Sequence, residues 1–265
     1  MHIRILTALA LAAFSLHAQP QAPQMNEWYS HIAYKVKPGM GEAFVKHMAV
    51  VKKFAQSRKD AGQIKNWGVY RVIAPTGATQ DVDYVTLVAW PKRAEIDPDV
   101  IAKMNAPHWQ KAGTTQQQWV TQLNELATVV RTSVTIRRAE AGTHGVGDLL
   151  RVDYIKISPG EMGEYLNRER SVYKPVHEAR IKDGGMKGWA LHTYVFPAGE
   201  ERVADAFTIQ TFTNSDQMFG GPGPAGGAAL FVKVHPNANY LQTVNRQNEI
   251  RKIVRSMALK HIDGL

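Results

Sequence analysis

The sequence predicts an α+β protein in which two tandem βαββαβ units join their sheets into one eight-stranded antiparallel barrel with helices outside. Two observations support this. Four sequence blocks recur in the same order about 122 residues apart, as Trp67 and Trp189 do, and both halves have the same order of strand and helix periodicities. The 265 residues, 44% of them hydrophobic, are enough for a buried core.

The repeat is clearest at a turn after the first strand of each half and around a tryptophan in the second strand. Pro38-Gly39 returns as Pro159-Gly160, and Trp67 returns as Trp189. An ordered set of such pairs indicates an internal duplication. The expected domains are a first repeat over residues 27–140, a linker over 141–148 and a second repeat over 149–265.

The elements follow from the spacing of apolar residues. Alternation with β-branched and aromatic residues predicts strands, and apolar stripes at spacings of three and four predict helices. The expected elements are strand 28–36, helix 41–58, strands 67–74 and 82–90, helical residues 100–127 broken near Pro107 and Gly113, and strand 129–138, then strand 149–157, helix 161–182, strands 188–196 and 203–212, helical residues 228–250 and strand 252–260.

Each βαββαβ half corresponds to a ferredoxin-like unit, whose helices leave one face of its four-stranded sheet uncovered. Two such units can bury these faces by closing a barrel around a small cavity. In element order, Pro-Gly turns and hairpin tryptophans, the chain resembles the dimeric α/β-barrel superfamily as a tandem duplication. This superfamily includes cofactor-independent monooxygenases of the antibiotic-biosynthesis type, haem proteins such as chlorite dismutases, and lactone isomerases. The resemblance implies the fold and leaves the activity open.

The first 18 residues have the features of a cleaved signal peptide. A positive region ends at Arg4, an apolar run of twelve residues extends from Ile5 to Leu16, and the small residue Ala18 precedes Gln19. Residues 19–26 are expected to be a disordered lead-in. We therefore expect export, to the periplasm or as a secreted protein, with no membrane partner after cleavage.

The composition excludes several classes of chemistry. Without cysteine, the chain has no disulfide, thiolate metal ligand or thiol nucleophile. The net charge of +9 permits an anionic small-molecule ligand, but the charges form no basic run, so we expect no nucleic-acid partner. The expected oligomeric state is a monomer or a homodimer.

Alternation gives each strand two faces, of which one must line the barrel. In the third strands, the apolar set Val85, Leu87, Phe207 and Ile209 is expected under the helices. The opposite, mixed set is expected to line a ligand cavity. With Tyr70 from the second strand and two arginines that open the last strands, the candidate substrate-binding residues are Tyr70, Tyr84, Thr86, Thr208, Gln210, Arg131 and Arg255.

The candidate catalytic residues are His192, His177 and Tyr154. A neutral imidazole can accept a proton, and a tyrosine hydroxyl can polarise an oxygen. His177 follows Pro175, which should kink its helix. Alternative interpretations are that these histidines are structural and that the barrel interior is simply packed.

The two arginines and a glycine-rich segment also have alternative interpretations. Arg131 and Arg255 could bind a ligand carboxylate at the cavity mouth, or could pair with Glu125 and Glu249 to join a helix end to a strand. The glycine-rich residues 220–227 are expected to form a loop over one end of the barrel, which could act as a lid.

We expect a cofactor-independent enzyme, of monooxygenase or isomerase type, acting on a small organic substrate. One alternative is a haem-binding or haem-dependent oxidoreductase, because the resemblance implies an axial histidine on a helix packed against the barrel. The haem candidates are His108, His177 and His235. The other alternative is a non-catalytic ligand-binding protein. No metal-binding motif is present, and no cofactor is predicted.

Overall fold

The computed structural model describes residues 26–75, 80–93, 97–199, 202–221 and 223–265, and its strands close into one antiparallel barrel in the order β1-β3-β2-β8-β5-β7-β6-β4. The elements are β1 (Glu27–Val36), α1 (Gly41–Asp60), β2 (Asn66–Pro75), β3 (Tyr84–Trp90), α2 (Pro98–Lys111), α3 (Gln116–Leu126), β4 (Ala127–Gly142), β5 (Leu149–Ile157), α4 (Met162–Arg168), the π-helix η1 (Glu169–Tyr173), α5 (Lys174–Lys182), β6 (Gly188–Phe196), β7 (Ala206–Phe212), α6 (Ser215–Phe219), α7 (Gly223–Val234), α8 (Tyr240–Ile250) and β8 (Arg251–Gly264). The predicted fold class is confirmed.

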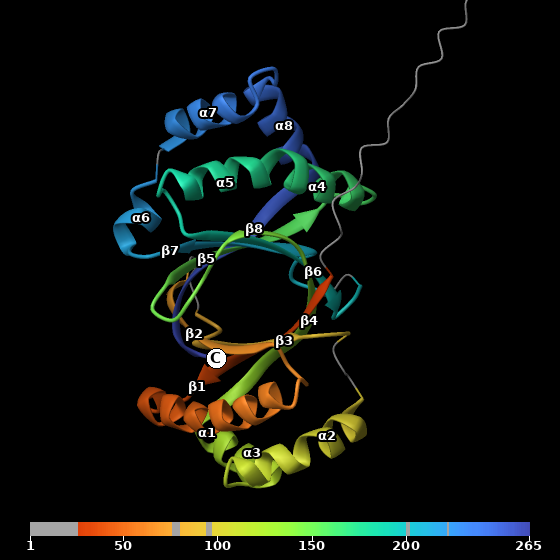
Figure 1. Ribbon diagram of the computed structural model, residues 1–265, viewed down its shortest axis with the longest axis vertical. Helices are drawn as coiled ribbons and strands as arrows, with labels where there is room; N and C mark the ends of the chain where they lie inside the picture. Colours follow the sequence, from red (N-terminus) through yellow and green to blue (C-terminus); the bar gives the residue numbers. More distant parts are fainter. Residues whose placement is uncertain (1–25, 76–79, 94–96, 200–201, 222) are drawn as a thin grey trace, which may run out of the picture.

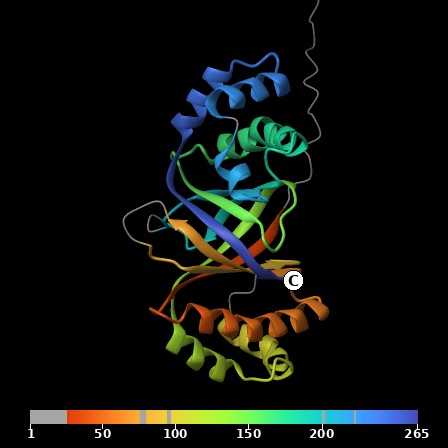
Figure 2. The same cartoon turned by 90° about the vertical axis from the view of Figure 1, so that its left-hand side faces the viewer.

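The helices form two layers on opposite sides of the barrel, seen end-on in Figure 1 and from the side in Figure 2. Helices α1 to α3 cover the sheet of the first half, and α4 to α8 cover that of the second. Each layer encloses its own apolar core, around Phe44 of α1 in the first half and around Tyr165 of α4 in the second.

Two seams join the halves. Strand β2 pairs with β8, and β4 pairs with β6, so each half completes the hydrogen bonding of the other. A third apolar cluster lies inside the barrel and takes residues from both halves, including Tyr70, Val152, Phe207 and Leu259. The barrel is therefore one folding unit.

Two expected helical segments can be compared with the structure. The expected break at Gly113 is confirmed, because its φ of +82° ends one helix before Thr115 caps the next, but the expected break at Pro107 is wrong, because Pro107 lies inside α2. The expected helix 161–182 contains the five-residue π-helix immediately before α5, where Pro175 lacks the N–H for a helical hydrogen bond.

The expected lid is wrong. Residues 223–234 form helix α7, which contacts α5 and α8 in the outer layer. The expected signal peptide lies outside the described residues. In the part of the chain that the structure describes, no helix is long and apolar enough to cross a membrane.

Candidate functional site

The barrel encloses a cavity of about 100 Å³ that is lined from all eight strands. A cavity of about 150 Å³ binds benzene in other proteins, so this smaller one has room for a few waters and is about two-thirds of the size that a single ring occupies there. His31 and Tyr154 lie deep in the barrel yet are only half-buried, because part of their accessible surface faces the cavity.

The expectation about the faces of the third strands is wrong. The lining side of β3 and β7 carries Val85, Leu87, Phe207 and Ile209. The residues expected to line the cavity, Tyr84, Thr86, Thr208 and Gln210, are absent from its lining and belong to the helix side of the sheets. Tyr84 packs against Phe44 at 4.7 Å between ring centroids, and Gln210 accepts a hydrogen bond from Arg180 of α5 at 3.4 Å. Both faces of these strands are buried, so hydrophobicity does not distinguish them.

Two histidines from different halves, His31 and His192, line the cavity with 6.2 Å between their ring centroids. The hydroxyl oxygen of Thr135 lies 2.9 Å from Nε2 of His31 and 3.3 Å from Nδ1 of His192. A hydroxyl can donate to one imidazole while it accepts from the other. The arrangement His31–Thr135–His192 can therefore pass a proton between the two rings.

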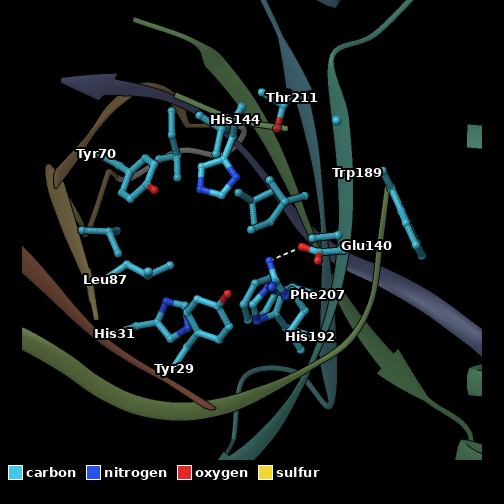
Figure 3. A pocket seen from close by; sticks show the side chains of 18 of the residues that line it. Tyr29, His31, Tyr70, Leu87, Glu140, His144, Trp189, His192, Phe207 and Thr211 are labelled. Atoms are coloured by element: carbon cyan, nitrogen blue, oxygen red, sulfur yellow. Dashed lines mark ion pairs between the residues drawn. The ribbon is translucent and has the colours of Figure 1, made fainter. Parts of the chain in front are cut away.

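Aromatic rings surround this pair, as Figure 3 shows. Phe207 stacks on His192 with 4.8 Å between ring centroids and meets His31 edge-on at 5.5 Å. Tyr29 contacts His192 edge-on at 4.8 Å. Such walls favour a flat ligand. Among the described residues, no hydrogen-bond partner is found for Nδ1 of His31 or Nε2 of His192.

Burial controls the protonation of these groups. Desolvation lowers the pKa of His31 to about 4 and holds that of His192 well below its ordinary value. It also raises the pKa of Tyr70, Tyr154 and Tyr194. At neutral pH the two imidazoles are free bases, and the three tyrosine hydroxyls are protonated and able to donate.

We expect the imidazole of His31 to stay neutral from pH 8 to pH 5, because its pKa is about 4. The ¹⁵N chemical shifts of its ring in the free protein measure this directly. Free histidine added to the sample is the reference and should titrate near the ordinary pKa of about 6.5. A His31 midpoint near that value would contradict a desolvated site.

A cluster of charged side chains lies at one end of the barrel. Arg137 forms ion pairs with Glu27 and Glu140, and the hydroxyl of Tyr29 donates to Glu27 at 2.5 Å. His144, from the segment between β4 and β5, also lines the cavity at this end (Figure 3).

At the other end, a carboxylate meets two arginines. Arg255 binds both oxygens of Asp81, at 2.9 and 2.5 Å, and Nη2 of Arg131 lies 3.9 Å from the same carboxylate. The expected pairing of Arg255 with Glu249 is wrong, because Glu249 pairs with Arg246 at 3.3 Å. The β2–β8 seam brings Asp81 close enough to take that place.

The structure brings together some of the predicted site residues and separates others. His192, Tyr154, Tyr70 and Arg131 line the cavity. His177 does not line the cavity: from α5 it stacks on Trp189 of β6, with 4.8 Å between ring centroids, and Trp189 itself is one of the lining residues (Figure 3).

Sequence reasoning missed His31, Tyr29, Tyr194 and Phe207. The first two share the strand parity of Ala33, and Tyr194 shares that of His192, so alternation from those two residues would have found them. Phe207 was assigned to the wrong face.

The three haem candidates lie outside the barrel, and each already has a partner. His108 bonds Ser57 through Nδ1 at 2.8 Å, and His235 bonds the carbonyl of Val172 through Nε2 at 2.9 Å. His177 is stacked on Trp189. A porphyrin needs several times the volume of the barrel cavity, so the residues present do not fit a haem there. Across the described ranges, no group of three acidic or histidine side chains could hold a metal ion.

No protein-family model matches the sequence, and no curated protein matches it. Among solved structures, the chain is similar to a candidate monooxygenase from Lactobacillus acidophilus NCFM, with 9% identity, a TM-score of 0.51 and coverage of 90% of this chain and 95% of that one. It is also similar to a candidate monooxygenase from Fusobacterium nucleatum, with 8% identity, a TM-score of 0.51 and coverage of 90% of this chain and 94% of that one. A haem-binding protein from Thermus thermophilus matches with 10% identity, a TM-score of 0.47 and coverage of 90% of this chain and 92% of that one. The chain thus has the dimeric α/β-barrel fold, with both halves of the barrel supplied by one polypeptide.

Proposed function

We propose that the barrel binds a compact single-ring organic molecule and that His31, Thr135 and His192 transfer a proton to and from it. The observation that carries this proposal is the pair of neutral imidazoles bridged by one hydroxyl, in a cavity of about 100 Å³ with aromatic walls. The protein is then a cofactor-independent enzyme of isomerase or monooxygenase type.

The chemistry starts with a proton on carbon next to a carbonyl group. An imidazole accepts this proton, and a protonated tyrosine such as Tyr70 donates a hydrogen bond to the carbonyl oxygen, where the negative charge collects. His31 alone is a weak base because its pKa is low. An enolate beside it raises that pKa, because opposite charges attract strongly in a desolvated cavity.

Two outcomes are open to the enolate. If the proton returns to a different carbon, the reaction is an isomerisation and nothing else is consumed. If dioxygen reacts instead, a CH₂ group becomes a carbonyl, one oxygen atom enters the product and the other leaves as water. Both reactions need the same first proton transfer.

The isomerisation of 3-cyclohexen-1-one to its conjugated isomer tests the proposal, because the product absorbs in the ultraviolet and the substrate has one ring. We expect the wild type to accelerate it and Thr135→Val to reduce the rate at least about tenfold by breaking the relay. His108→Gln, which changes a ring in the outer helix layer, should keep the wild-type rate. Binding of the ketone without any conversion would make the protein a ligand-binding protein and contradict catalysis.

We propose further that residues 1–18 are removed on export to the periplasm or the medium. The apolar run before Ala18 supports this. Mass spectrometry of the exported protein should give a chain that begins at Gln19, and an intact Met1 on exported protein would contradict cleavage.

A further inference from the structure

Two arginines at matched positions of the two halves converge on one mouth of the barrel. Arg131 of β4 lies opposite Ala33 of β1, and Arg255 of β8 lies opposite Tyr154 of β5. Ala33 and Tyr154 both line the cavity, as does Arg131 itself. The duplication has therefore placed two guanidinium groups beside the same opening.

One carboxylate among the described residues pairs with these two cations. Asp81 comes from the first half, and the residue 122 positions later in the second half is Val203. Among the described residues, no other carboxylate forms an ion pair with Arg131 or Arg255. The mouth therefore carries one positive charge in excess.

The contact is accessible to a ligand. The exposed fractions of the side chains are 27% for Arg131, 19% for Arg255 and 39% for Asp81. Partly exposed ion pairs contribute little net stability, because water screens them. A carboxylate from solution can therefore replace that of Asp81 at low cost.

We propose that Arg131 and Arg255 bind the carboxylate of the substrate, and that Asp81 occupies its position when the barrel is empty. The substrate is then a small monocarboxylic acid whose ring or chain extends into the cavity. This inference rests on the proposed function for the position of the reacting carbon. Arg131 and Thr135 are four residues apart on β4, about 13 Å between Cα atoms at ~3.3 Å per residue. The arginine side chain spans part of that length, and a single-ring acid spans the rest.

Benzoate and phenol, which share a ring and differ in charge, test this inference by calorimetric titration. Asp81→Asn removes the competing charge and keeps the side-chain size. We expect this variant to bind benzoate at least about tenfold more tightly than the wild type does, and to bind phenol equally well. In the Asp81→Asn background, adding Arg131→Gln should abolish the gain.

Asp263→Asn is the matched control, because it makes the same change in net charge but removes the ion-pair partner of Lys52. It should leave benzoate affinity unchanged. An equal gain in this control, or no gain in folded Asp81→Asn protein, would overturn the inference. If Asp81→Asn does not bind benzoate more tightly while phenol still binds the cavity, the carboxylate site is ruled out and the proposed function stands. If neither ligand binds any variant, both fail.

Discussion

Residues 27–142, expressed without the second half, are expected not to form a folded monomer. Strands β2 and β4 lose their partners β8 and β6, which leaves two unpaired edges. The inner face of the sheet, with Tyr70, Val85 and Leu87, loses its cover as well. Each large apolar side chain uncovered costs about 1.5–3 kcal/mol, and a domain has only about 5–15 kcal/mol of net stability.

Size-exclusion chromatography with light scattering, together with circular dichroism, measures this outcome. We expect either an unfolded chain or a homodimer in which a second copy supplies the missing strands. Co-expression with residues 149–265 should restore a one-to-one complex. A folded monomer of the first half alone would contradict the shared barrel.

Replacement of Glu169 is expected to change how stability depends on pH. This carboxyl is the first residue of the π-helix and is only 3% exposed. Gln247 donates a hydrogen bond to it at 2.8 Å, but desolvation dominates and raises its pKa from 4.5 to about 7. The equivalent residue in α1 is Met48, four positions after Phe44 as Glu169 is four after Tyr165, and it is buried and apolar.

The raised pKa of Glu169 determines whether its contribution to stability rises or falls with pH. The folded protein holds this proton more tightly than the unfolded chain does, so the group favours folding below about pH 4.5, and this contribution is lost as the pH rises to about 7. The shift corresponds to about 3 kcal/mol. Glu169→Gln is neutral at every pH, so its stability relative to wild type should rise by about this amount between pH 4 and pH 8.

Urea unfolding at the two pH values, with wild type and variant side by side, measures the difference. Glu178→Gln, at an exposed position on α5, should keep the wild-type dependence on pH. The same pH dependence in wild type and Glu169→Gln would contradict a desolvated carboxyl at this position.

The fold could be predicted because its signals are local. The repeated Pro-Gly turns and the change between strand and helix periodicity depend on neighbours in the chain, and both are visible without the structure. Which strand face lines the barrel is a tertiary property. Since both faces are buried here, the apolar row around Leu87 gave the wrong answer.

The site shows the same division. The candidates His192, Tyr70 and Tyr154 came from comparing equivalent strand positions, and all three line the cavity. The contact of His31 with His192 through Thr135 joins three strands from both halves, so no local pattern reports it. Likewise, the choice of Asp81 over Glu249 as the partner of Arg255 depends on the β2–β8 seam.

We propose that His31 and His192 form the contact site for a small ring inside the barrel. The most direct measurement is the ¹⁵N NMR spectrum of the histidine rings while phenol is added to saturation. We expect the His31 and His192 signals to shift, and those of His108 and His235 to stay unchanged because they lie outside the barrel. Unchanged His31 and His192 signals at saturation, or shifts confined to the outer histidines, would contradict it.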